Sequence, residues 1–315
     1  MSPDRRLTVS VPTAQLREAL VELAPGLSIV EWDMSGPPPS HEFDIVVPPY
    51  MSPPSLLRRL VDVRTRLVQS QMVGYDGVRE VLPLGVVFAN ATSVHETSTA
   101  ELTLALILAS QRGIPDFVRA GDEGRWAPRW HQSLADRTVL LVGYGGVGRA
   151  IESRLSGFEV TLERLALHGR TDETGTIHGI DSLPRLLPVA DVVVVVVPLT
   201  PATTHLIDDS FLSSMHDGSL LVNVSRGQVA DTDALMAHAG SGRLRLALDV
   251  TDPEPLPDAH PLFALRNVLV SPHVGGMTSA MLPRMARLID EQIVRMQRGE
   301  SPINVVLPDR HLTGT

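Results

Sequence analysis

The chain has 315 residues, 43% hydrophobic and 20% charged, and this length and composition predict about two globular domains. The formal net charge of −9 argues against a nucleic-acid-binding protein, which would normally carry a basic face. The absence of cysteine excludes disulfides, thiolate nucleophiles and cysteine-ligated zinc, and we expect no metal site.

Lysine is absent too, because all 27 residues counted as lysine or arginine are arginine. This excludes Schiff-base catalysis, the lysine of a phosphate-binding P-loop, and any dehydrogenase that uses lysine as its acid or base. Residues 1–16 lack the apolar core of a signal peptide, and the apolar run at 100–110 is too short to span a bilayer. We therefore expect a cytoplasmic protein without a membrane partner.

Near the start of the chain, apolar runs predict short strands at 43–47 and 65–70 with a helix at 53–63 between them. A long, largely buried helix is expected over 95–112, where apolar residues recur at helical spacing behind a polar start. The following segment, 113–136, is rich in glycine, proline and charge, and it is predicted to be a surface connection.

Strand and helix patterns alternate through the rest of the chain. The valine and leucine runs do not alternate with polar residues, as parallel strands covered on both faces require. The pattern predicts an α/β fold with a doubly wound sheet in a second unit that starts near residue 95, and a last helix that crosses back to the first unit. The expected strands are 138–143, 191–198, 218–225, 244–250 and 267–272, and the expected helices are 146–157, 231–242 and 279–300.

A glycine-rich turn links the strand at 138–143 to the helix that follows it. Its glycines form the pattern GxGxxG, which allows a tight turn, close approach of a pyrophosphate and close helix–strand packing. The helix N-terminus then faces the phosphates, so we interpret the turn as a dinucleotide site rather than an ordinary connection. The candidate cofactor-binding residues here are Gly143, Tyr144, Gly145, Gly146, Val147 and Gly148.

The position that would bind the ribose of NAD lacks its usual acid. An acidic residue is expected about 20 residues after the glycines, at the end of the second strand, but residues 166–168 carry none. Glu163 is expected within the strand, and Arg170 lies just beyond it. Arg170 is either a site for the 2′-phosphate of NADP or a plain exposed arginine, so the cofactor is predicted to be NAD or NADP, with at least tolerance of NADPH.

Polar residues follow three later strands at the ends where doubly wound sheets bind ligands. Arg226 follows one strand, and Asp249, with Glu254 shortly after it, follows the next. His273 follows the last, in the sequence SPHVGG. Individually they are explained as a surface ion pair, a loop acid and a turn histidine. Together they suit hydride transfer to a 2-oxo acid, because arginine binds the carboxylate and polarises the carbonyl, and a histidine paired with a carboxylate donates the proton.

The sequence resembles the D-isomer-specific 2-hydroxyacid dehydrogenase family, in particular its NAD(P)-dependent members similar to glyoxylate and hydroxypyruvate reductases. The resemblance covers nearly the whole chain and is strongest from 95 to 276. It rests on the stretches VGYGGVG, DVVVVVVPLTPATTHLI, VNVSRGQVAD, LDVTDPEPLPDAHPLF and NVLVSPHVGG, in the order and spacing of the family.

The resemblance implies the roles of individual residues. Arg226, Glu254 and His273 take the catalytic positions, and Asp249 takes the position that holds the nicotinamide amide. The cofactor site extends to Pro198, Thr200 and Gly275, and the loop at 71–78 is similar to the one whose backbone amides bind the substrate carboxylate. The implied substrate-binding residues are Met72, Val73, Gly74, Arg226 and His273.

The family fold implies two doubly wound, Rossmann-like domains. Residues 1–94 and 285–315 would form a flavodoxin-like substrate domain, and residues 95–284 would form the dinucleotide-binding domain inserted into it. A homodimer is the usual assembly of the family, and packing within it or within a loop is favoured over substrate recognition for Trp126 and Trp130.

Other activities on this fold stay open. A phosphite-type dehydrogenase would use the same three catalytic residues, whereas formate enzymes of the family carry glutamine at the position of Glu254. A non-enzymatic relative that senses the dinucleotide would bind cofactor without turnover. Within the favoured reading, glyoxylate, hydroxypyruvate and bulkier 2-oxo acids are all candidate substrates.

Overall fold

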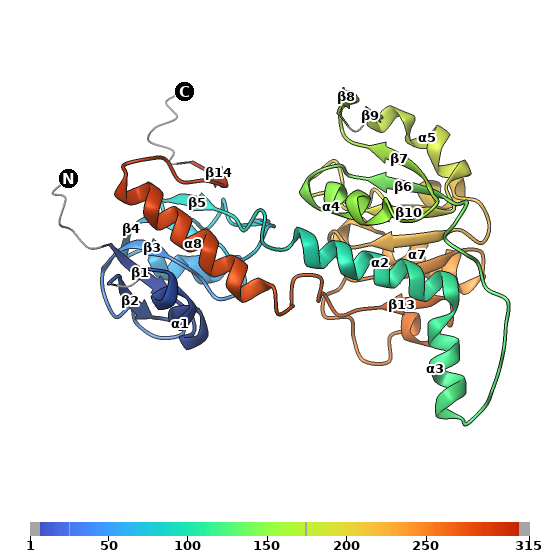
Figure 1. The fold of residues 1–315 in the computed structure, drawn as a ribbon, viewed down its shortest axis with the longest axis horizontal. Coiled ribbons are helices and arrows are strands. Elements are labelled where there is room, and N and C mark those ends of the chain that lie inside the picture. Colours follow the sequence, from blue (N-terminus) through green and yellow to red (C-terminus); the bar gives the residue numbers. More distant parts are fainter. Residues whose placement is uncertain (1–6, 25, 174, 309–315) are drawn as a thin grey trace. The chain divides into compact units, whose positions relative to one another are not determined.

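The computed structural model describes residues 7–24, 26–173 and 175–308. The chain forms two compact α/β units, one built from the residues up to His95 and from Thr278 onward, the other from Glu96–Met277 (Figure 1). The predicted α/β class with two doubly wound sheets is confirmed.

The first unit contains a six-stranded sheet in the order β14-β5-β4-β3-β1-β2. Its first five strands in the chain are parallel, and their order is that of flavodoxin-like folds, whereas β14 pairs antiparallel with β5. The segment predicted as a helix at 53–63 is a 3-10 helix, η1, which begins at the second of two consecutive prolines. The elements are β1 (Thr8–Val11), α1 (Ala14–Leu23), β2 (Ser28–Glu31), β3 (Glu42–Val46), η1 (Pro54–Leu60), β4 (Arg64–Gln69), β5 (Val87–Ala89), α8 (Met281–Gln297) and β14 (Val305–Leu307).

Helix α8 belongs entirely to the first unit. It packs against α1, and its buried face, including Met285 and Ile289, joins one core cluster with Val9 and Leu16. The expected return of the chain is thus present, but the expected boundary between 284 and 285 lies inside this helix. The unit boundary lies before α8, because the whole apolar face of the helix is needed to cover the sheet.

The second unit contains a six-stranded parallel sheet in the order β13-β12-β11-β10-β6-β7. A parallel bridge from Leu165 to His178 continues this sheet beyond β7, so the order follows the Rossmann pattern. The elements are α2 (Glu96–Arg112), α3 (Ile114–Asp122), β6 (Thr138–Val142), α4 (Gly146–Leu155), β7 (Thr161–Leu165), β8 (Arg170–Asp172), β9 (Gly175–Ile177), η2 (Ile180–Ser182), α5 (Leu183–Leu186), η3 (Leu187–Val189), β10 (Val192–Val195), α6 (Asp209–Ser214), β11 (Leu220–Asn223), η4 (Gly227–Val229), α7 (Thr232–Gly240), β12 (Arg245–Leu248), η5 (Pro261–Ala264) and β13 (Val268–Val270).

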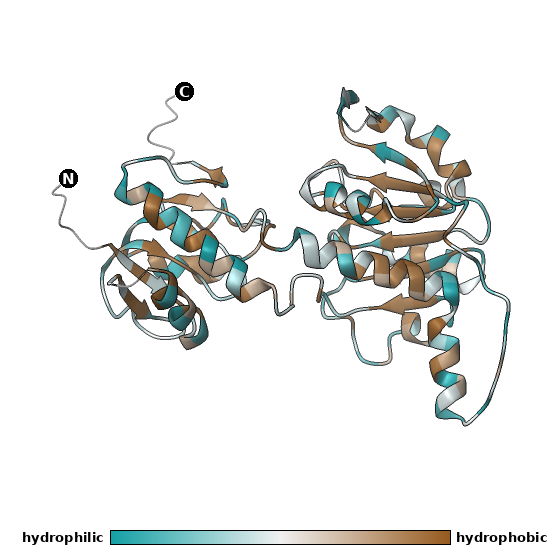
Figure 2. Cartoon of the chain, viewed as in Figure 1, coloured by the Kyte–Doolittle hydropathy of each residue, from teal (hydrophilic) through white to brown (hydrophobic). Residues whose placement is uncertain are grey.

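Apolar clusters lie on both faces of this second sheet. All four residues of β10 are buried, with alternate side chains in the two clusters. Figure 2 shows its central strands in the brown of hydrophobic residues. This confirms that the unalternated valine and leucine runs belong to strands covered on both sides.

The segment predicted as a surface connection at 113–136 contains a helix instead. Helix α3 begins after Gly113, whose backbone is left-handed, and Pro115 occupies its first turn, where proline is tolerated. Its apolar residues Ile114, Phe117 and Val118 are exposed. The prediction missed this helix because glycine, proline and charged residues surround its few apolar side chains.

Candidate active site

The glycine turn connects β6 to α4 at the carboxyl edge of the second sheet (Figure 1). Gly143 has φ +108°, and a Cβ there would lie 2.6 Å from the carbonyl oxygen of Val196. A Cβ on Gly148 would lie 2.5 Å from the Gly143 oxygen, whereas a Cβ on Gly145 would meet no atom within 4 Å. The protein itself therefore requires the first and third glycines, while the open space at Gly145 suits a pyrophosphate at the start of α4.

The side chain of Tyr144 is engaged inside the protein and is not available to a cofactor. It is buried and its hydroxyl hydrogen-bonds to Glu152, while the guanidinium carbon of Arg149 lies 4.8 Å from its ring centroid. Only its backbone is therefore left to serve a bound dinucleotide. Its carbonyl oxygen accepts a hydrogen bond of 3.2 Å from Arg170 Nη2, which places this arginine against the glycine turn.

Two features mark the end of β7, where the ribose of a dinucleotide is expected to bind. Glu163 lies within β7, as expected, and its carboxylate is 3.0 Å from His178 Nε2. Residues 166–168 follow the strand without any carboxylate, and Arg170 begins β8. This end of β7 therefore presents a cation where NAD-specific sites place an acid.

The loop after β10 contains Pro198 and Thr200. The hydroxyl of Thr203 donates to the Pro198 carbonyl at 2.6 Å and accepts from the Thr200 N–H at 2.8 Å. These bonds close the loop at the same sheet edge as the glycine turn.

Arg226 is fixed at the end of β11 by the contacts of its neighbours. The side-chain amide of Asn223 donates to the Arg226 carbonyl at 3.1 Å, and Arg226 Nη1 donates to the Ser225 carbonyl at 2.7 Å. A Cβ on Gly227 would overlap the Thr251 carbonyl, so only glycine allows this turn to pack against the segment that carries Glu254. This packing was not foreseen, although the glycine after Arg226 was visible in the sequence.

Glu254 and His273 are in direct contact, with Glu254 Oε1 hydrogen-bonded to His273 Nδ1. Burial raises the pKa of Glu254, but the hydrogen bond and charge of His273, together with the charge of Arg226, outweigh it. The pKa of Glu254 therefore lies below its ordinary value of 4.5. The structure thus brings the three residues of the expected catalytic set together, with Glu254 on Nδ1 of the histidine ring.

Asp249 is buried at the end of β12, and both its carboxylate oxygens are engaged by the protein. They accept hydrogen bonds from the N–H groups of Val274 and Gly275 at 2.9 and 3.0 Å. A Cβ on Gly275 would lie 3.0 Å from Asp249 Oδ2, so the glycine permits this close approach. Asp249 therefore holds the His273 loop, a function that the sequence pattern did not reveal.

The expected carboxylate-binding loop lies in the first unit. The Met72 carbonyl accepts from the Ala91 N–H at 2.9 Å, and the Val73 carbonyl accepts from the Asn90 amide at 2.8 Å. The Met72 N–H is engaged by Ser70 Oγ at 3.0 Å. No described residue accepts from the N–H groups of Val73 or Gly74, so this pinned loop presents two backbone donors.

Comparisons with known proteins identify the family. The model of the D-isomer specific 2-hydroxyacid dehydrogenase NAD binding domain matches residues 104–275. A glyoxylate reductase of Korarchaeum cryptofilum is 34% identical over 77% of this chain and 76% of its own length. The human glyoxylate reductase/hydroxypyruvate reductase is 31% identical over 95% of this chain and 98% of its own.

The chain belongs to the D-isomer specific 2-hydroxyacid dehydrogenases. A member of this family from Xanthobacter autotrophicus, crystallised with NADPH and MES, has a TM-score of 0.81 and 30% identity, covering 97% of this chain and 99% of its own. The protein is thus an NAD(P)-dependent oxidoreductase of 2-hydroxy and 2-oxo acids.

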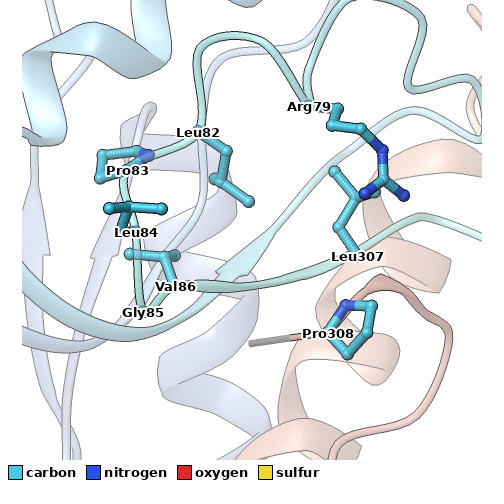
Figure 3. A pocket seen from close by; sticks show the side chains of 8 residues that line it. All are labelled: Arg79, Leu82, Pro83, Leu84, Gly85, Val86, Leu307 and Pro308. Carbon is cyan, nitrogen blue, oxygen red and sulfur yellow. The ribbon is translucent and has the colours of Figure 1, made fainter. Parts of the chain in front are cut away.

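The pocket in Figure 3 is not part of this dehydrogenase site. It lies in the first unit, between the segment 79–86 and the end of β14, and holds about 20 Å³, room for little more than a water molecule. Across residues 7–24, 26–173 and 175–308, no group of three or more acidic or histidine side chains is placed to bind a metal ion. Within the same residues, no helix has the length and apolar character to cross a membrane.

Proposed function

We propose that this dehydrogenase reduces a small 2-oxo acid to the D-2-hydroxy acid with His273 as proton donor. The observation that carries the proposal is the hydrogen bond between Glu254 and His273, with the charge of Arg226 beside them. All three residues follow the carboxyl ends of strands in the second sheet, the edge at which doubly wound folds bind ligands.

Each residue of this set has a distinct task. Arg226 binds the substrate carboxylate and polarises the adjacent carbonyl through its planar fork of donors. His273 gives a proton from Nε2 to the oxygen as it becomes an alkoxide, and removes it in the reverse direction. Glu254 orients the ring through Nδ1 and stabilises the imidazolium. A bound nicotinamide supplies the hydride.

The first unit is proposed to bind the substrate carboxylate. Val73 and Gly74 offer two adjacent backbone N–H groups on a loop whose carbonyls are held from behind. Paired backbone donors of this kind form concave sites for anions. The Met72 N–H is already bonded to Ser70 Oγ, so it is not offered to the substrate. Met72 supports the loop through its carbonyl, which accepts from the Ala91 N–H.

Glyoxylate and hydroxypyruvate are the proposed substrates, supported by the names of the matched relatives. The test is oxidation of NADPH and NADH, followed at about 340 nm, against glyoxylate, hydroxypyruvate, pyruvate, phenylpyruvate and 2-oxoisocaproate. Turnover is expected to be fastest with one of the first two acids. Fastest turnover with a bulky acid would contradict the substrate proposal. Cofactor binding without turnover of any acid would favour one of two other functions. One is a phosphite-type dehydrogenase, to be tested next with phosphite as substrate, and the other is a non-enzymatic dinucleotide sensor.

NADPH is the proposed physiological cofactor, because Arg170 lies at the glycine turn and residues 166–168 provide no acid. We expect Arg170→Ala to weaken NADPH binding roughly tenfold, the loss of one charged hydrogen bond, and to leave NADH binding unchanged. Binding is measured by nucleotide fluorescence, with Arg185→Ala, on the same unit in α5, as the control. Equal losses for both nucleotides would contradict the proposal.

A homodimer is the proposed assembly. The exposed apolar residues of α3 are accompanied by Trp126 and Trp130, which are 95% and 101% exposed. Exposed apolar surface on this scale marks an interaction site, and a second copy of the chain would cover it. The two tryptophans are therefore assigned to assembly rather than to substrate recognition.

A further inference from the structure

The loop that carries His273 is wrapped around one buried carboxylate. Asp249 Oδ1 accepts hydrogen bonds from Ser271 Oγ at 2.6 Å and from the Val274 N–H, while Oδ2 accepts from the Gly275 N–H. The Asp249 carbonyl also accepts from the His273 N–H at 2.7 Å. Asp249 is only 3% exposed, so residues on both sides of the histidine are anchored to a group that water does not reach.

This anchoring maintains an unfavourable backbone conformation. His273 has φ +53°, in the left-handed region, which disfavours residues other than glycine. Pro272, immediately before it, has no N–H to contribute to the loop. Such a conformation persists only where the surroundings determine it. The His273 side chain that it positions contacts Glu254.

We propose that Ser271 is a positioning residue for proton transfer, acting on His273 through Asp249. The inference rests on the proposed function, because proton donation by His273 is the step that Ser271 would serve. Among the three groups that donate to the Asp249 carboxylate, Ser271 is the side-chain donor, so it can be changed without altering the backbone.

The experiment compares Ser271→Ala with Ser271→Thr, which keeps the hydroxyl. Ser219→Ala is the control, because the hydroxyl of Ser219 also donates a hydrogen bond, to the His216 carbonyl at 2.7 Å. Ser219 lies just before β11, at the opposite edge of the same sheet. We expect Ser271→Ala to lower kcat roughly tenfold, the effect of one hydrogen bond to a charged group. The KM values for the 2-oxo acid and NADPH should not change, and the other two variants should match the wild type.

A pH profile provides a readout that a purely structural role would not move. Glu254 faces the side chains of His273 and Arg226 and the backbone of Thr251. If Ser271→Ala loosens the histidine, the pKa of Glu254 rises toward its ordinary value of 4.5, and the acidic limb of kcat/KM moves to higher pH. Ser271→Thr should restore the wild-type limb.

Wild-type kcat and an unshifted acidic limb in Ser271→Ala would overturn the proposal, as would an equal loss in Ser219→Ala. Crystal structures of the wild type and Ser271→Ala test the same point without turnover. We expect the variant to lose the left-handed conformation of His273 or its contact with Glu254, and retention of both would contradict the inference. An inactive wild type would refute the proposed function, while these structures would still decide the role of Ser271.

Discussion

In the proposed mechanism, Glu254 determines how the site responds to pH. Because its pKa lies below 4.5, the carboxylate is ionised at neutral pH, and activity should be lost only as the pH falls through that lowered value. Glu254→Gln removes the charge, so we expect kcat to fall by a factor of about ten to a hundred and the acidic limb to disappear. Steady-state kinetics from pH 4 to 8 measure both effects, with the exposed Glu159→Gln as the control. An acidic limb retained in Glu254→Gln would contradict this role.

The site residues that the sequence predicted differ in a physical way from those that only the structure suggests. Glu254 and His273 were predicted because each follows a recognisable strand and carries side-chain chemistry that the reaction needs. The tasks of Ser271 and Gly227 depend on atoms that meet across two strand ends, and spacing along one strand contains no such information. Tyr144 lies in the motif, yet its side chain belongs to the core behind the turn.

At the scale of the element, different glycines of the β6–α4 turn are expected to serve folding and cofactor binding. Gly148→Ala places a Cβ 2.5 Å from a backbone oxygen, and overpacking of that kind should lower Tm by about 4–8 °C. Gly145→Ala meets nothing in the protein but intrudes on the pyrophosphate. For Gly145→Ala we therefore expect an unchanged Tm. NADPH binding should be weaker by roughly tenfold or more, because the added methyl group would clash with a phosphate. Thermal unfolding and nucleotide titration check the pair, and a lowered Tm in Gly145→Ala would contradict it.

Most strands of the second unit were predicted because continuous valine runs specify buried parallel strands. The failures were at elements with mixed signals. The glycines and charges around α3 concealed a helix, and the paired prolines at the start of η1 imposed a tighter turn than an α-helix. The antiparallel strand β14 was not predicted.

At the scale of the whole molecule, the sequence could indicate two units but not the point at which the chain leaves the second one. That point depends on which sheet the apolar face of α8 covers, and both sheets need helices of the same character. The proposed dimer is likewise a property of exposed surface rather than of a motif.

Val118→Arg tests the dimer, since it places a charge on the exposed apolar side of α3. Light scattering should give a mass near 34.1 kDa for this variant and twice that for the wild type. Val61→Arg, a comparably exposed site in the first unit, should leave the mass unchanged. A wild-type mass of one chain would contradict the assembly.

The turnover of His273→Ala tests the central claim most directly, because His273 is the proposed proton donor. We expect kcat with the best 2-oxo acid to fall by about a hundredfold or more, the scale of general acid–base catalysis, while the Kd for NADPH stays at the wild-type value. His216→Ala, at a half-buried histidine of the same unit, should retain full activity. Near-normal turnover by His273→Ala would contradict the proposed mechanism.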